Sequence, residues 1–320
     1  MGRHDLELSE SPEELRRFER RLIADIDALE RMLDLDVLEK RITRIGLEQE
    51  FVRIAEHGRP APRALEVLDA LGGDGSVYQT ELALFNVEVA LPPFELTGDC
   101  FTQLEATLRR EMGAIRTAAR KHGTNVLAIG ILPTLGWEHL TLDYMTPSPR
   151  YAALNKRVTG MRGGEFRIHI RGTDILHATH DNVLLEAFNT SFQLHLQVTP
   201  ENFARTYNAM QLATGLAVAA SGNSPLLLGH RLWEETRVAL FRQSVDTRTD
   251  PELRRGSRPR VFFGEEWVEK SILELVQADA ARFRVVRPVD DGEPMPGEVL
   301  DGGGIPKLSA LALHNGTIYR

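Results

Sequence analysis

The stretch RIGLEQEFVRI, residues 44–54, alternates apolar and polar side chains, and this pattern decides how the chain folds. Alternation with a period of two predicts a β-strand, with Ile45, Leu47 and Phe51 on one face and Glu48 and Glu50 on the other. Carboxylates two positions apart on a strand point the same way, with Cα atoms about 6.6 Å apart. We therefore expect one face of this strand to be anchored in a core. The carboxylates must face water, a cavity or a metal ion.

A second acidic segment lies about thirty residues further along the chain. Asn86 and Glu88 share the polar face of a strand predicted over residues 77–91. Glu81 precedes Glu88 by seven residues, an odd number, so the two can reach one site only if a bulge or a turn lies between them.

A third polar strand face is predicted over residues 191–198, where Gln193, His195 and Gln197 alternate with apolar side chains. The apolar side chains on its reverse are Phe192, Leu194, Leu196 and Val198. Three such strands predict a sheet that lines a cation-filled cleft. Carboxylates with one imidazole and no thiolate suit Mg²⁺ or Mn²⁺, and such ions can bridge the phosphates of ATP.

The rest of the chain mixes helical and extended patterns, which predicts an α+β fold with a largely antiparallel, funnel-like sheet. An apolar stripe from residue 15 to residue 33 predicts an N-terminal helix that packs on the domain or on its copy in a dimer. Further helices are expected over residues 62–71, 99–121, 200–220, 231–244 and 265–278, and further strands over 125–131 and 165–171. The prolines at 92–93 are expected to end the second strand, and the Gly- and Pro-rich run 290–304 to form a flexible lid or surface loop.

Composition limits the function classes. The 320 residues carry 38 Lys and Arg against 46 Asp and Glu, a net charge of −8, which argues against a general nucleic-acid or anionic-membrane binder. The single cysteine, Cys100, excludes an intramolecular disulfide and any cysteine-built metal site, and fits a reducing compartment. Because no run approaches about 20 consecutive apolar residues, we expect no membrane span and a cytoplasmic location.

Several familiar catalytic signals are missing. The sequence contains no phosphate-binding P-loop, no dinucleotide-binding glycine motif, no nucleophile elbow and no H-E-x-x-H motif. Cys100 fits a structural cysteine better than a nucleophile. His177 and His180, with Asp181 beside them, could chelate a metal if helical, although a solvated polar turn is the favoured interpretation.

From about Ile45 to Arg320 the chain carries an ordered set of short motifs, namely IGLEQEF at 45–51, EL…VEV at 81–89, RY at 150–151, SFQLHLQV at 191–198, NSP at 223–225 followed by Trp233 and Arg237, and HNGTIYR at 314–320. In this set the chain resembles the glutamate-cysteine ligase type 2 family (carboxylate-amine ligases) of the glutamine synthetase-like superfamily.

The resemblance implies a funnel of antiparallel strands that holds two or three Mg²⁺ ions between ATP and an amino-acid carboxylate. It implies metal ligation by Glu48, Glu50, Glu81, Glu88 and His195. It also implies catalytic roles for Arg320 and Arg237, whose guanidinium groups would offset charge on phosphate or carboxylate. Binding of nucleotide or substrate is expected of Arg150, Asn315, Gln193 and Gln197.

Two features depart from the family pattern. Gln197 stands where much of the family has a second histidine, so no acid–base role is expected there. The chain ends at Arg320, where family members continue. We therefore expect a helical appendage over residues 1–43 and a catalytic domain over 44–320 that is incomplete at its C-terminal end.

The leading hypothesis is an ATP- and Mg²⁺-dependent ligase that forms an amide bond, such as a γ-glutamyl bond, through an acyl phosphate. The alternatives are a catalytically incomplete homologue that binds a nucleotide or metabolite, and a phosphotransferase that uses the same site. The expected partners are small molecules (ATP, glutamate or a similar carboxylate, and an amine), with no nucleic acid or membrane. A homo-oligomer remains open.

Overall fold

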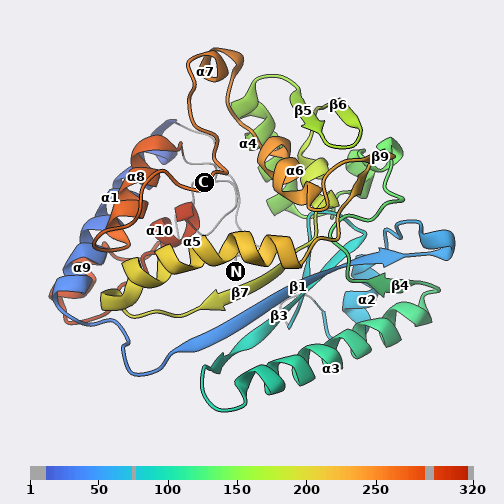
Figure 1. Cartoon of the computed structure of the whole chain (residues 1–320). Coiled ribbons are helices and arrows are strands. Elements are labelled where there is room, and N and C mark those ends of the chain that lie inside the picture. Colours follow the sequence, from blue (N-terminus) through green and yellow to red (C-terminus); the bar gives the residue numbers. More distant parts are fainter. Residues whose placement is uncertain (1–11, 74–76, 285–291, 316–320) are drawn as a thin grey trace.

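The long strand β1 (Arg44–Ile54) is the centre of the main sheet (Figure 1). The computed structural model describes residues 12–73, 77–284 and 292–315. Along one edge β1 pairs with β3 (Asn86–Glu95), which in turn pairs with β2 (Tyr78–Thr80). Along its other edge β1 pairs first with β7 (Phe192–Leu196) and then with β4 (Asn125–Leu127). Every pairing is antiparallel, and the α+β class is as predicted.

One face of this sheet is buried under α2 (Ala64–Ala70) and the long helix α3 (Cys100–Lys121), which runs along the bottom of Figure 1. The apolar side chains of Ile45, Leu47 and Phe51, which alternate along β1, are all buried and belong to this core. The predicted alternation in residues 44–54 is therefore confirmed. The opposite face carries the half-buried side chains of Glu48 and Glu50.

The second predicted strand is divided, and its end differs from the prediction. A turn separates β2 from β3, and β3 continues past the prolines at 92–93 to Glu95. Leu47 pairs with Leu91 but Ile45 pairs with Phe94, so both prolines lie in a bulge opposite Gly46. Residues in a bulge are left out of the regular ladder, so the missing N–H groups of the prolines break no hydrogen bond there.

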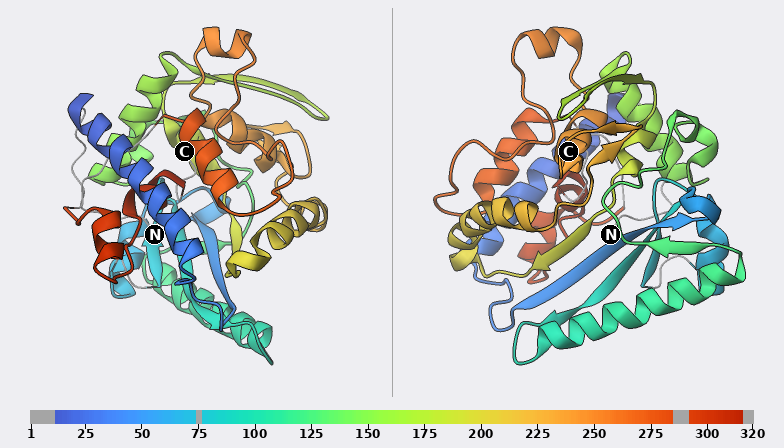
Figure 2. Two further views of the ribbon diagram at one scale, coloured as in Figure 1. Left: turned by 90° about the vertical axis from the view of Figure 1, so that its left-hand side faces the viewer. Right: turned by 45° about the vertical axis from the view of Figure 1, so that its right-hand side comes forward.

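The N-terminal helix α1 (Pro12–Asp34) packs within its own chain, against α8 (Leu273–Arg282), α9 (Pro296–Asp301) and α10 (Ser309–Asn315). Figure 2 shows α1 beside these orange and red helices. The buried carboxylate of Asp25 accepts hydrogen bonds from the backbone N–H groups of Ala310 and Leu311 at 2.8 and 3.0 Å, and so satisfies the first turn of α10. The apolar stripe of α1 therefore packs on the rest of its own chain, which is one of the two packings expected from the sequence.

A second core joins α4 (Pro149–Arg162), the hairpin of β5 (Phe166–Arg171) and β6 (Ile175–His180), the 3₁₀ helix η4 (Val183–Phe188), and α6 (Thr236–Ser244). His177 and His180 lie in β6, three positions apart and so on opposite faces. His180 is buried against Phe166, whereas the exposed His177 stacks on His169. Neither the chelating pair nor the polar turn considered for these histidines is present.

Other boundaries also differ from the predictions. The helix expected from residue 231 begins at Thr236, because 230–231 form the short strand β9 (His230–Arg231) that pairs with β8 (Leu226–Leu227). The helix expected over 265–278 is α8, and the strand expected over 125–131 is only β4. Within the run expected as a lid, the described residues 292–304 include α9, which packs on α1. The remaining elements of two or more residues are η1 (Glu56–Gly58), η2 (Trp137–His139), η3 (Leu142–Tyr144), η5 (Pro200–Asn202), α5 (Phe203–Ala220) and α7 (Asp250–Arg254).

The apolar side chains on the reverse face of β7 were expected to be buried, and the structure does not bury them. Phe192 and Leu194 are 51% and 52% exposed, because the core under α3 includes side chains of β1 to β4 but none of β7. The neighbouring segment α5 likewise has no buried residue. Among the described residues, no helix has both the length and the apolar character needed to cross a membrane.

The packing of α1 makes a testable prediction about stability. Leu22 is 4% exposed and Ile23, the next residue, is 59% exposed. We expect Leu22→Ala to lower the free energy of unfolding by about 2–4 kcal/mol, because it leaves a cavity among α1, α8 and α10. Ile23→Ala should change it by less than about 1 kcal/mol. Urea denaturation of the two variants measures the difference, and equal losses would contradict the packing described here.

Candidate functional site

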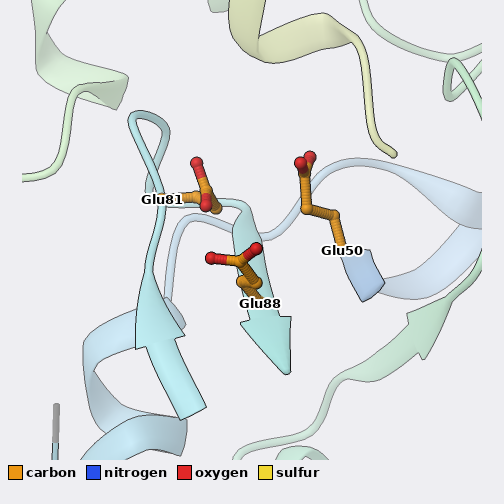
Figure 3. A group of neighbouring side chains, drawn as sticks. All are labelled: Glu50, Glu81 and Glu88. Carbon is orange, nitrogen blue, oxygen red and sulfur yellow. The ribbon is translucent and has the colours of Figure 1, made fainter. Parts of the chain in front are cut away.

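Three glutamate side chains converge on the face of the sheet that points away from α3 (Figure 3). Glu50 comes from β1, Glu88 from β3, and Glu81 from the turn between β2 and β3. One carboxylate oxygen of each residue can be chosen so that all three oxygens lie within 4.8 Å of one another. Glu50 lies more than thirty positions before Glu81 and Glu88 in the sequence, yet the three form one cluster, which we call the glutamate triad.

The register of the sheet brings these side chains together. Glu50 and Glu88 are directly opposite each other in the β1–β3 ladder, so their side chains lie side by side on one face. Glu81 reaches the same place because the ladder stops at Thr80, and the chain turns before β3 begins at Asn86. Such a break is needed, because seven residues of uninterrupted strand would have put Glu81 on the opposite face.

Glu48 and His195 extend the triad along the sheet. The Glu88 carboxyl group is hydrogen-bonded to both Glu81 and Glu48. The Nε2 atom of His195 lies 3.4 Å from the Oε2 atom of Glu48. His195 is carried by β7, where it pairs with Gly46 of β1. All five residues predicted to be metal ligands are therefore neighbours on one face of one sheet.

Burial and mutual repulsion disfavour ionisation of the triad. Burial is the main cause that raises the pKa of Glu50 to about 8, and the charges of Glu186 and Glu88 add to it, against a hydrogen bond from Ser191. Burial, with the charges of Glu50 and Glu186, raises the pKa of Glu81 to about 8. Burial, Glu81 and Glu48 raise the pKa of Glu88 to about 9. The triad therefore retains protons near neutral pH unless a positive charge replaces them.

Glu186 is an acidic neighbour of the triad that sequence reasoning missed. It lies in η4, and its charge acts on both Glu50 and Glu81. The buried Asn86 side chain fixes η4 to the sheet, since its Nδ2 atom donates to the carbonyl oxygen of Ala187 at 2.7 Å. One signal was available in the sequence, because Glu186 is the only charged residue in the apolar run VLLEAF at 183–188.

Gln193 lies next to the triad through Ser191. The Nε2 atom of Gln193 donates to Ser191 Oγ at 3.0 Å, and Ser191 Oγ donates to Glu50 Oε1 at 2.5 Å. Gln193 also faces Glu48 in the β1–β7 ladder. Gln193 therefore lies beside the acidic face, and its role in binding nucleotide or substrate stays a prediction.

Arg237 contacts the segment that leads into β7. Its Nε and NH2 atoms each donate to the carboxylate of Glu235 at 2.9 Å, and its NH1 atom donates to the carbonyl oxygen of Thr190 at 2.7 Å. These contacts brace the chain just before Ser191. Binding of phosphate or carboxylate by Arg237, as expected from the sequence, would have to be added to this bracing role.

Arg150 lies at the start of α4 and packs over the ring of Tyr151, 5.5 Å from its centroid. The hydroxyl of Tyr151 donates to the carbonyl oxygen of Thr80 at 2.9 Å, immediately before Glu81. Arg150 is therefore near the turn that carries Glu81. Its role in nucleotide binding stays a prediction.

The structure places Gln197 and Asn315 in other surroundings. The side chain of Gln197 bonds to Arg44 and Glu39 at 3.0 and 3.2 Å, and Arg44 is six residues, or about 20 Å of extended strand, from Glu50. Asn315 ends α10, which packs with α1 and α8, and its amide atoms are buried. Arg320 lies outside the described residues.

The donor set of the triad fits a hard divalent cation. Carboxylate oxygens are the ligands that Mg²⁺ and Mn²⁺ prefer, and their spacing here lets one ion contact all three. The raised pKa values also fit, because a cation would replace the protons that hold the triad together. Glu48 and His195 offer an oxygen and a nitrogen for a second ion beside the first.

The pKa values predict how stability depends on pH without metal. Unfolded glutamates ionise near pH 4.5, whereas the folded triad holds protons up to pH 8 or 9. The folded state therefore binds more protons within this window, and its stability falls as pH rises. We expect Glu81→Gln to raise the melting temperature in EDTA by about 2–4 °C at pH 8, and by less at pH 5.5.

Glu105→Gln is the matched control, because Glu105 is an exposed carboxylate on α3. Thermal denaturation of both variants over pH 5.5–9 measures the effect. A pH-independent shift for Glu81→Gln, or an equal shift for the control, would show that repulsion within the triad does not limit stability.

The comparison with protein families agrees with this geometry. A family model described as glutamate-cysteine ligase family 2 (GCS2) matches residues 44–262, which begin at the first residue of β1 and include the whole triad. A search of curated proteins finds no match. Because the family model covers more than half of the chain, the protein belongs to glutamate-cysteine ligase family 2.

Proposed function

We propose that this protein is an ATP- and Mg²⁺-dependent carboxylate–amine ligase that forms an amide bond through an acyl phosphate. The family supports a ligase of this general kind. The observation that carries the proposal is the glutamate triad, in which three carboxylates share one face and have oxygens within 4.8 Å of one another. Three carboxylates held this close together are explained if a divalent cation binds between them.

In this proposal Glu50, Glu81 and Glu88 hold one divalent cation, and Glu48 with His195 holds a second. When bound, these ions would neutralise charge on the phosphates of ATP during transfer of the γ-phosphoryl group. The carboxylates of the chain orient the site, since each is fixed by the sheet or by a hydrogen bond. Glu186 adds negative charge beside the triad and so favours cation binding further.

The proposed reaction has two steps. A carboxylate oxygen of the first substrate attacks the γ-phosphorus of ATP, which forms an acyl phosphate and releases ADP. The nitrogen of an amine then attacks the acyl carbon, phosphate leaves with the electrons of the C–O bond, and the nitrogen loses a proton. We propose glutamate or a similar amino acid as the carboxylate, with a γ-glutamyl bond as one form of the product.

The direct test supplies ATP, Mg²⁺ and pairs of amino acids and follows both ADP release and product mass. We expect ADP release that requires Mg²⁺, a carboxylate and an amine together, with a product lighter than the two substrates by one water. A stable phosphorylated product without an amide would instead indicate a phosphotransferase. ATP binding without any turnover would indicate a nucleotide-binding homologue, and both outcomes would contradict the ligase proposal.

Removing one charge from the triad should abolish this activity. Glu50→Gln retains the shape of the side chain but weakens cation binding. Because bound ions supply several kcal/mol of transition-state stabilisation, we expect turnover to fall about 100-fold or more. Metal-free stability should not fall, because repulsion within the triad decreases. Glu105→Gln again serves as the control, and wild-type turnover by Glu50→Gln would exclude Glu50 as a ligand.

A further inference from the structure

A short chain of hydrogen bonds ends on the glutamate triad. Gln193 Nε2 donates to Ser191 Oγ at 3.0 Å, and Ser191 Oγ donates to Glu50 Oε1 at 2.5 Å. None of these bonds belongs to the β-ladder. They link a polar side chain of β7 to a carboxylate of β1 through the residue that immediately precedes β7.

Chemistry fixes the direction of this chain. An amide nitrogen can only donate, so the bond from Gln193 occupies a lone pair of the Ser191 hydroxyl. The hydroxyl has one proton, and Glu50 Oε1 is the acceptor in line with it. Glu50 therefore receives a hydrogen bond on one oxygen, which favours its ionised form and limits the rotation of its carboxylate.

The backbone of Ser191 is held from the side of the sheet. Its carbonyl oxygen accepts hydrogen bonds from the backbone N–H of Glu50 at 3.0 Å and from Gln49 Nε2 at 3.1 Å. Because backbone hydrogen bonds join Ser191 to β1 at Glu50 itself, the Ser191 hydroxyl and the Glu50 carboxylate are fixed relative to each other.

The preceding residue is held from the opposite side. The carbonyl oxygen of Thr190 accepts from Arg237 NH1, and its N–H donates to the carbonyl oxygen of Gly130 at 2.9 Å. Packing there is close, since a Cβ atom on Gly130 would lie 2.3 Å from Asn223 Oδ1 and 2.8 Å from Arg237 Nε. Arg237 is itself held by Glu235. The hydroxyl of Ser191 is therefore presented to Glu50 by a rigid support.

We infer that Ser191 is a positioning residue for the metal ligand Glu50, and that Gln193 directs its hydroxyl proton. Ser191 holds one carboxylate oxygen so that the other is presented to a divalent cation shared with Glu81 and Glu88. This inference deepens the proposed function and rests on it. Outer contacts that orient a metal ligand are worth about 10- to 100-fold in metal affinity, which sets the size of the expected effect.

The test is calorimetric titration of Mn²⁺ alone into the full chain, with Mn²⁺ electron paramagnetic resonance as a spectroscopic check. Four proteins are compared, namely the wild type, Ser191→Ala, Ser191→Thr and Ser221→Ala. Ser221 is the control because it is exposed and its hydroxyl donates to the carbonyl oxygen of Ala217 in the helix just before it. We expect Ser191→Ala to weaken Mn²⁺ binding about 10- to 100-fold. Ser191→Thr, which keeps the hydroxyl, should remain within about 3-fold of the wild type, as should Ser221→Ala.

Melting temperatures in EDTA separate positioning from a structural role. We expect Ser191→Ala to melt within about 2 °C of the wild type, because its backbone bonds to β1 remain. The inference is overturned if Ser191→Ala binds Mn²⁺ like the wild type, or if Ser191→Thr is weakened as much as Ser191→Ala. Failure of the wild type to bind Mn²⁺ would overturn the proposed function itself, which distinguishes the two failures.

Discussion

Repulsion among three partly buried carboxylates is the constraint on which the structure of the site depends. Oxygens of Glu50, Glu81 and Glu88 lie within 4.8 Å of one another, and burial raises the pKa of all three side chains. Such a group is costly to keep ionised without a cation. The surrounding contacts hold the glutamates together despite this cost, through the β1–β3 ladder, the turn between β2 and β3 and the hydrogen bond from Ser191.

The two faces of the main sheet differ in what they contribute to the protein. The face under α3 is a continuous apolar core that stabilises the strands, and the other face carries the acidic groups. Elements from the second core then complete the acidic face, because η4 supplies Glu186 and Arg237 of α6 braces the chain before Ser191. The site is thus assembled from β1 and β3 at one side and from residues 186–195 at the other.

Much of this arrangement could be predicted from the sequence because it follows from the alternation of side chains. Residues 44–54 indicate a strand with one apolar and one acidic face, and the odd spacing of Glu81 and Glu88 requires the turn that the structure contains. The continuation of β3 through its prolines could not be predicted, since it depends on the bulge opposite Gly46. The exposure of Phe192 and Leu194 could not be predicted either, since it depends on which strands the core under α3 includes. The surroundings of Gln197 could not be predicted because a shared strand face does not specify distance along the strand.

We expect the triad to bind a divalent cation in exchange for its protons. Calorimetric titration of Mg²⁺ into the protein at pH 7, in two buffers of different ionisation enthalpy, measures the protons released per ion bound. Because the pKa values of the triad are raised to about 8–9, we expect the wild type to release at least about one proton per ion bound. Binding without proton release, or no binding at all, would contradict it.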